Sequence, residues 1–255
     1  MNIEKKVKLL YNMQIGGDIM VTLITGATSD LGKAIAEVFA KNNYDLILTY
    51  HNNVKVCQKQ KEELEKKYNI SVNIEYLDIT EENLITKIVN NYDIDILINN
   101  AAFTNDEDLS TKSVETFKKV IDTNILGTFL VTRKVGEKMQ SNKSGSIINV
   151  SSTNGIYSNY PESIDYDASK AAINSMTKNF ADYFAPYVRV NAVAPGWINT
   201  SINNNLNPNF KNKELEKILL HRFAEPVEIA NTIYNIATDT YINKSIIIVD
   251  GGYHA

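Results

Sequence analysis

Apolar runs rich in β-branched residues alternate with longer stretches of helical periodicity, and this alternation constrains the fold most strongly. Seven runs are apolar nearly throughout, which is typical of strands buried on both faces: Val21–Thr25, Asp45–Tyr50, Val72–Asp78, Ile94–Asn99, Ser146–Val150, Val188–Ala194 and Ile246–Val249. Helices are expected at Gly32–Lys41, Val54–Tyr68, Glu81–Asn90, Val114–Gln140, Ala168–Phe184, Lys213–Leu220 and Pro226–Thr238. Such alternation predicts an α/β fold, a doubly wound parallel seven-stranded sheet with helices on both faces.

Length and composition favour one soluble domain. A chain of 255 residues suits a single α/β domain, and no linker rich in Pro, Gly or Ser divides it. A net charge of −4 gives no electrostatic reason to expect nucleic acid or an anionic membrane as a partner. No apolar run approaches the roughly 20 residues that span a bilayer, so we expect a cytoplasmic protein. The single cysteine, Cys57, precludes an intrachain disulfide and a cysteine-rich metal cluster, and no metal is expected.

The organised sequence begins at Met20, directly before the first expected strand. Gly16-Gly17 lies just upstream, and glycine codons can form a purine-rich ribosome-binding site. We therefore expect Met20 to be the natural start, and residues 1–19 to be either a misassigned extension or a disordered leader. Residues 20–255 would then form the catalytic domain.

A glycine turn lies between the first strand and the first helix, in the segment Thr25-Gly26-Ala27-Thr28-Ser29-Asp30-Leu31-Gly32. A turn at this place aims backbone N–H groups and the positive end of the helix at a diphosphate. Asp30 adds bulk and a negative charge beside such an anion. Alternatively, Asp30 caps the helix, a position that aspartate favours.

Tyr166 and Lys170 are four residues apart, so on a helix they lie on one face. A lysine cation beside a phenol stabilises the tyrosinate and lowers its pKa. The phenol then becomes usable as a general acid or base near neutral pH. The spacing therefore predicts a Tyr–Lys catalytic pair.

Further polar motifs stand at the ends of expected strands and inside one helix. Asn124 interrupts a helix with an apolar face, where an amide is unfavourable unless it is hydrogen-bonded. Ser151-Ser152 ends the fifth strand, and the two side chains lie on opposite faces of that strand. The remaining motifs are Asp78-Ile79, Asn99-Asn100-Ala101-Ala102, Pro195-Gly196-Trp197-Ile198-Asn199-Thr200 and Asp250-Gly251-Gly252.

Taken in order and with their spacing, these motifs resemble the short-chain dehydrogenase/reductase family over residues 20–253. The resemblance implies a single Rossmann-type domain of the short branch, which moves a hydride between NAD(P)H and a carbonyl or alcohol. It implies catalytic roles for Ser152 on the carbonyl oxygen, Tyr166 as proton donor, Lys170 on Tyr166 and the nicotinamide ribose, and Asn124 on a relay water. The implied cofactor contacts are Gly26, Thr28, Ser29, Asp30, Leu31, Gly32, Asp78, Ile79, Asn100, Ala101, Ala102, Tyr166, Lys170, Pro195, Gly196, Ile198 and Thr200.

The end of the second strand bears on the choice of cofactor. An acidic side chain there binds the ribose 2′-OH and repels a 2′-phosphate. This chain has Tyr50 where NAD-dependent relatives carry Asp, followed by His51 and Asn52. The absence of a carboxylate favours NADP over NAD.

The substrate is left open between a 3-oxoacyl group on acyl carrier protein and a free ketone, sugar or polyol. The first fits many similar enzymes, with Lys143 as a candidate basic contact for the acidic carrier. Asp182 stands where those reductases typically have Arg, and a polar loop, residues 199–213, is expected to shape the pocket. The resemblance also implies a homotetramer or homodimer formed through the helices of Asn124 and Tyr166. The alternative function is a non-catalytic NAD(P)-binding sensor or scaffold, which Asp30 alone supports.

Overall fold

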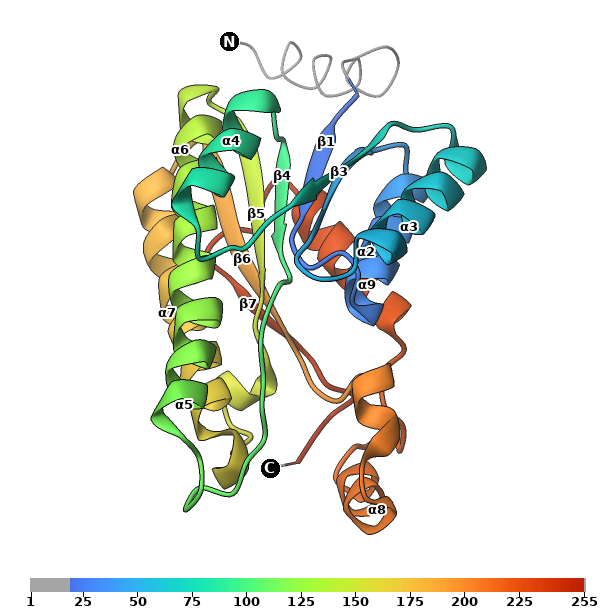
Figure 1. The fold of residues 1–255 in the computed structure, drawn as a ribbon, viewed down its shortest axis with the longest axis vertical. Helices are drawn as coiled ribbons and strands as arrows, with labels where there is room; N and C mark the ends of the chain where they lie inside the picture. The colour runs from blue at the N-terminus through green and yellow to red at the C-terminus, as the bar shows by residue number, and fades with distance from the viewer. Residues whose placement is uncertain (1–18, 255) are drawn as a thin grey trace.

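The computed structural model describes residues 19–254, and their strands form one parallel sheet (Figure 1). The order across the sheet is β3-β2-β1-β4-β5-β6-β7. The bounds are β1 Val21–Ile24, β2 Asp45–Tyr50, β3 Val72–Tyr76, β4 Ile96–Asn99, β5 Gly145–Val150, β6 Val188–Pro195 and β7 Ile246–Val249. The predicted α/β fold is thus confirmed, whereas the expectation for the leader before Met20 concerns a segment outside the described residues, apart from Ile19.

Helices cover both faces of the sheet (Figure 1). One face carries α2 (Asp30–Lys41), α3 (Val54–Tyr68) and α9 (Pro226–Thr238), whose apolar side chains share one core with the strands. The other face carries α4 (Glu82–Asn91), α6 (Thr128–Ser141) and α7 (Ile164–Phe184), which form the second core. The short elements are α5 (Val114–Ile121), η1 (Asp122–Gly127), η2 (Thr153–Gly155), η3 (Pro161–Ser163), η4 (Ser201–Asn205) and α8 (Pro208–Glu216).

Close packing fixes α7, the helix that carries Tyr166 and Lys170. Phe184, at its carboxyl end, is fully buried and lies on Gly136 of α6. A Cβ at residue 136 would stand 2.3 Å from the Phe184 ring, so the glycine permits this approach of the two helices. The contact lets α7 pack closely against α6 and so helps to fix the position of the polar residues on α7.

Two predicted helices differ from the structure. The expected continuous helix Val114–Gln140 contains the π-helical turn η1, which separates α5 from α6. The helix expected at Lys213–Leu220 is instead α8, Pro208–Glu216, which begins inside the region predicted as a loop, residues 199–213. Asn207 caps α8 by accepting from the backbone N–H of Asn209, and Pro208 occupies the first turn, where proline needs no N–H partner.

No helix among residues 19–254 is long and apolar enough to cross a membrane.

Candidate active site

The predicted site residues converge at the carboxyl ends of the strands. Parallel strands end at one edge, and β1 and β4 meet there at the point where the strand order reverses. The glycine turn follows β1, Ser152 follows β5, and the first turns of α7 bring Tyr166 and Lys170 to the same edge. Helix α7 begins four residues before its predicted start, so both side chains belong to one helix.

Ser152, Tyr166 and Lys170 form a compact group. The Ser152 hydroxyl lies near enough to the Tyr166 side chain to lower the pKa of the phenol, and it donates to Asn154 Oδ1 at 3.2 Å. The Lys170 ammonium lies 5.2 Å from the centroid of the Tyr166 ring and donates to the Val150 carbonyl at 2.8 Å. Ser151 points elsewhere and donates to the Lys170 carbonyl at 3.2 Å. The structure therefore places Ser152, as predicted, beside the tyrosine.

Burial dominates the titration of this pair. It raises the pKa of Tyr166 to about 12, against the lowering effect of the Ser152 hydrogen bond. It lowers the pKa of Lys170 to about 8. The structure does not show the expected lowering of the Tyr166 pKa, because burial opposes the tyrosinate and the Lys170 ammonium donates to Val150. Tyr166 therefore holds its proton at neutral pH.

Asn124 lies in η1 and is fully buried. Its Oδ1 accepts from the Phe103 N–H at 2.7 Å, and its Nδ2 donates to the Phe103 carbonyl at 2.9 Å and to Ser169 Oγ at 3.0 Å. The amide thus joins the segment after β4 to α7. Both polar atoms of the Asn124 side chain are thus hydrogen-bonded to protein, so a relay water would contact the backbone of the π-helical turn instead. Such π-helical turns are frequent at functional sites.

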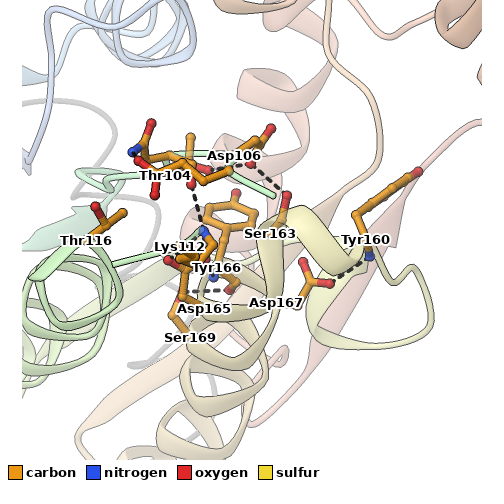
Figure 2. Close-up of polar contacts among 12 residues, drawn as sticks. Thr104, Asp106, Lys112, Thr116, Tyr160, Ser163, Asp165, Tyr166, Asp167 and Ser169 are labelled. Atoms are coloured by element: carbon orange, nitrogen blue, oxygen red, sulfur yellow. Dashed lines mark hydrogen bonds and ion pairs between the residues drawn. The ribbon is translucent and has the colours of Figure 1, made fainter. Parts of the chain in front are cut away.

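A buried ion pair next to Tyr166 was not predicted (Figure 2). Lys112 Nζ lies 2.9 Å from Asp165 Oδ1, and both side chains are almost wholly buried. The same ammonium donates to the Asn105 carbonyl, and Asp165 accepts from the Tyr166 N–H at 3.0 Å. The pair thus ties the segment between β4 and α5 to the first turn of α7. In the sequence, the acidic residue Asp165 directly before Tyr166 was the one sign of such a pair.

Two more carboxylates hold the same turn (Figure 2). Asp106 accepts from Ser163 Oγ at 2.7 Å, and Asp167 accepts from the Tyr160 N–H at 3.0 Å. Burial raises the pKa of Asp167, although the hydrogen bond from Asn154 opposes it. Both negative charges raise the pKa of Tyr166 and help to keep its proton in place.

The turn between β1 and α2 has the form that a diphosphate site needs. Gly26 adopts a φ of 63°, and a Cβ there would lie 2.8 Å from the Ala101 backbone. Asn100 donates to the carbonyls of Thr25 and Gly26, which fixes the turn against β4. The first backbone N–H groups of α2, around Ser29 to Gly32, face the end of the helix where anions bind.

Asp30 does not cap its own helix, contrary to the alternative raised above. Ser29 does so, accepting from the Gly32 N–H at 3.0 Å. The Asp30 carboxylate instead accepts from the backbone N–H and the hydroxyl of Ser201, both at 2.7 Å. These hydrogen bonds lower the pKa of Asp30 and hold its charge at Ser201.

The adenosine end of the predicted site lies beside β2 and β3. The His51 ring stacks on Tyr76 with centroids 5.8 Å apart, and its Nε2 lies 3.5 Å from Asp78 Oδ2. Asp78 Oδ1 accepts from the N–H and the hydroxyl of Thr80. Tyr50 packs edge-on against Tyr76, and Asn52 is exposed. Aromatic rings and one imidazole therefore border this end.

At the opposite end, the segment after β6 carries the predicted nicotinamide contacts. Gly196 donates to the Val249 carbonyl at 3.0 Å, Ile198 pairs with Ala224, and Thr200 directly precedes η4. Among the remaining predicted contacts, Ala101 donates to Thr25 Oγ1 and Ile79 packs on Gly127. Thr28 lies in the turn before α2, Leu31 in the first turn of α2, Ala102 in the segment after β4, and Pro195 at the end of β6.

A buried glutamate on α8 lies near the predicted nicotinamide contacts, and the sequence analysis did not predict it. Glu214 accepts from Tyr160 Oη at 2.6 Å, Tyr253 Oη at 2.7 Å and Trp197 Nε1 at 3.0 Å. Burial alone would raise the pKa of Glu214, but these hydrogen bonds outweigh it and lower that pKa. The glutamate thereby joins α8 to the loops after β5 and β6 and to the carboxyl-terminal segment.

Comparison with known proteins agrees with this geometry. A family profile described as "Enoyl-(Acyl carrier protein) reductase" matches residues 26–254. The chain is 39% identical over 239 residues to the 3-oxoacyl-[acyl-carrier-protein] reductase FabG of Thermotoga maritima, covering 91% of this chain and 96% of that protein.

Two solved structures share the fold over most of both chains. ElxO with NADP bound has a TM-score of 0.83 at 30% identity and covers 92% of this chain and 98% of that one. A 3-oxoacyl-[acyl-carrier protein] reductase from Brucella melitensis with bound NAD has a TM-score of 0.85 at 25% identity, covering 92% and 91%.

The Lys112–Asp165 pair predicts non-additive effects on stability. Lys112→Met leaves a buried, unpaired carboxylate and should lower the free energy of unfolding by about 3 kcal/mol. Lys112→Met with Asp165→Asn removes both charges, keeps an acceptor for the Tyr166 N–H, and should recover most of that loss. Urea unfolding measures both, with Lys59→Met in an exposed ion pair as a control near zero. Additive losses in the double variant would contradict a coupled pair.

Burial of Lys170 predicts that its removal stabilises the protein. The fall in its pKa from 10.5 to about 8 corresponds to about 3 kcal/mol, from which the lost hydrogen bond to Val150 subtracts about 1 kcal/mol. Lys170→Met should therefore raise the free energy of unfolding at pH 7 by about 2 kcal/mol.

The pH dependence provides the check. Between pH 8 and 10.5 the unfolded state binds the Lys170 proton more tightly than the folded state, so wild-type stability should rise with pH. The advantage of Lys170→Met, measured by urea unfolding, should shrink across this range. Lys178→Met, at an exposed position of α7, is the matched control. A variant less stable than wild type at pH 7 would refute the argument.

Proposed function

We propose that this chain, which belongs to the short-chain dehydrogenase/reductase family of NAD(P)-dependent oxidoreductases, reduces the ketone of a 3-oxoacyl group carried by acyl carrier protein. The observation that carries the chemistry is the grouping of Ser152, Tyr166 and Lys170, with the Lys170 ammonium 5.2 Å from the centroid of the Tyr166 ring. The substrate class rests on the similarity to the Thermotoga maritima reductase. Residues 20–255 are the proposed catalytic domain, and the cytoplasmic location stays a prediction.

The residues at the sheet edge fit a dinucleotide. The Gly26 turn and the amino end of α2 would hold the diphosphate, Tyr50 to Asn52 with Asp78 and Ile79 the adenosine, and Ile198 and Thr200 the nicotinamide. Tyr166 and Lys170 would contact the nicotinamide ribose. When bound, the cofactor supplies the hydride.

The chain's own residues then handle the carbonyl oxygen and its proton. Ser152 donates a hydrogen bond to that oxygen and orients the carbonyl. Tyr166, whose raised pKa keeps its proton in place, gives that proton to the oxygen as negative charge develops. Lys170, protonated below a pKa of about 8, stabilises the tyrosinate left behind. Asn124 holds η1 against α7, so the backbone of the π turn is positioned to hold a water that returns a proton.

The carrier proposal needs basic residues near the active-site edge. Lys143 is unsuitable, because it lies just before β5, at the amino end of the strands. Asp182 also lies away from the site and pairs with Lys244. Helix α8 carries Lys211 and Lys213 at the active-site edge, and these are the proposed contacts for an acidic carrier.

The alternative of a non-catalytic sensor or scaffold loses its support. It rested on the Asp30 charge beside the diphosphate, and that carboxylate is bonded to Ser201.

Tyr166→Phe tests the proposed chemistry. The variant keeps the ring but lacks the proton donor, so kcat for NADPH-dependent reduction of acetoacetyl-carrier protein should fall by at least about 100-fold with the melting temperature unchanged. Tyr183→Phe, exposed on the same helix, should retain full activity. Unchanged turnover in Tyr166→Phe would refute the mechanism. Wild-type activity on free ketones or sugars alone would refute the carrier substrate but not the reductase chemistry.

NADP is the proposed preferred cofactor, because the end of β2 lacks the carboxylate that would repel a 2′-phosphate. NADPH should bind more tightly than NADH, as measured by fluorescence titration. Tyr50→Asp should reverse the preference by weakening NADPH at least about tenfold, or 1.4 kcal/mol. Tyr50→Phe is the neutral control. Equal affinities for the two cofactors in wild type would overturn the preference.

A second copy of the chain is the proposed partner on the outer side of α5 and α7. Leu109, Val114, Phe117 and Ile164 line a hollow of about 240 Å³ there, and each side chain is at least 40% exposed. The edge strand β7 offers another exposed apolar side chain, Ile248, which supports a tetramer over a dimer.

Light scattering coupled to size-exclusion chromatography tests this assembly. Phe117→Glu should halve the particle mass, because a charge cannot be buried unpaired in an apolar interface. Lys118→Glu, also on α5, controls for the charge change. A monomeric wild type would refute the homo-oligomer.

A further inference from the structure

Asp30 forms a bridge between two segments that are 171 residues apart in the chain. It occupies the first turn of α2, in the glycine turn, while Ser201 begins η4 in the segment after β6. One carboxylate oxygen, Oδ2, accepts both the backbone N–H and the hydroxyl of Ser201 at 2.7 Å. Asp30 thereby joins the amino end of α2, among the predicted diphosphate contacts, to the first residue of η4, which directly follows the predicted nicotinamide contact Thr200.

The segment after β6 is otherwise held from one side. Its base is fixed by pairing of Ile198 with Ala224 and by donation from Asn199 to Glu225 at 3.0 Å. Its outer part is less supported, since Ile202 is 74% exposed. The Asp30 contact therefore anchors this outer part, residues 200–203, to the amino end of α2, where the predicted diphosphate contacts lie.

We propose that Asp30 is a positioning residue that clamps the segment 200–203 to the amino end of α2 and thereby retains the nicotinamide cofactor. The inference rests on the proposed NAD(P) site and assigns a use to the aspartate in the glycine turn. The clamp directs the carboxylate toward donors on Ser201 and so spares the diphosphate its charge. It also fixes Thr200, a predicted nicotinamide contact that directly precedes Ser201. Cofactor release then requires both hydrogen bonds to Ser201 to break.

The Ser201 hydrogen bonds keep the Asp30 carboxylate ionised at neutral pH, because they lower its pKa below the ordinary value. Lys33 lies 3.8 Å from the other oxygen, Oδ1, and contributes in the same direction. Hydrogen bonds to an ionised acceptor are stronger than those to a neutral one. The clamp is thus formed under the conditions in which the enzyme would turn over.

Stopped-flow measurement of NADPH dissociation, with excess NADP as the displacing ligand, tests the clamp in the full chain. Asp30→Ala removes the acceptor of both hydrogen bonds and should accelerate release about tenfold, the factor that corresponds to 1.4 kcal/mol. Ser201→Ala removes the hydroxyl donor alone and should have a smaller effect. The double variant should release NADPH no faster than Asp30→Ala, because both substitutions break one contact. Glu37→Ala, which removes a negative charge farther along α2, should leave the rate unchanged.

The opposite sign would overturn the proposal. If Asp30 only repels the diphosphate, Asp30→Ala will release NADPH more slowly than wild type and Ser201→Ala will match wild type. Independent, multiplicative effects of the two substitutions would also overturn it.

Hydrogen exchange of the cofactor-free protein separates this inference from the proposed function. Peptides covering residues 199–206 should exchange faster in Asp30→Ala than in wild type or Glu37→Ala. If wild type binds neither NADPH nor NADH, the proposed function fails, and cofactor retention fails with it. Unchanged exchange in Asp30→Ala, with cofactor binding intact, would refute the clamp alone.

Discussion

Parallel pairing of all seven strands is the constraint on which the rest of this structure depends. Because each strand ends at the same edge, residues from distant parts of the chain meet there, among them Gly26, Ser152 and Tyr166. The same pairing buries most strands on both faces and requires helices on each side. Function and fold therefore share one origin, since the crossovers that cover the sheet also deliver the polar side chains.

The active-site edge holds polar groups in places that favour apolar ones. Lys170 is buried with a lowered pKa, and the Lys112–Asp165 ion pair lies one residue from the tyrosine. Charges withdrawn from water destabilise a fold unless they are bonded, and here Val150, Asn105 and the Tyr166 N–H provide the partners. Catalytic position has been favoured over stability at α7.

Sequence reasoning predicted the elements whose signals are local. The parallel sheet with helices on both faces followed from alternating periodicity. Tyr166 and Lys170 followed from their four-residue spacing, and Ser152 followed from the family resemblance. Contacts between distant segments carry no such signal. Nothing in the sequence around Asp30 or Ser201 indicates that the two residues are hydrogen-bonded, and the side-chain hydrogen bonds of Asn124 depend on where Phe103 lies in the fold. The prediction of a lowered Tyr166 pKa was not met for a related reason. Burial raises this pKa, and burial cannot be read from a four-residue spacing. Helix α8 was missed even though Asn207-Pro208 is a local start signal, because the surrounding asparagines suggested a loop.

The shared bonds of Glu214 have a consequence for how such an enzyme can diverge. Three segments, carrying Tyr160, Trp197 and Tyr253, converge on this one carboxylate, which also pairs with Lys217. A replacement in any one of them leaves a buried acceptor short of a donor, and the other two must adjust. Residues that share one network do not contribute independently. Changes in substrate range that involve these three segments would then arise through correlated replacements, in which the order of mutation matters, rather than through single replacements.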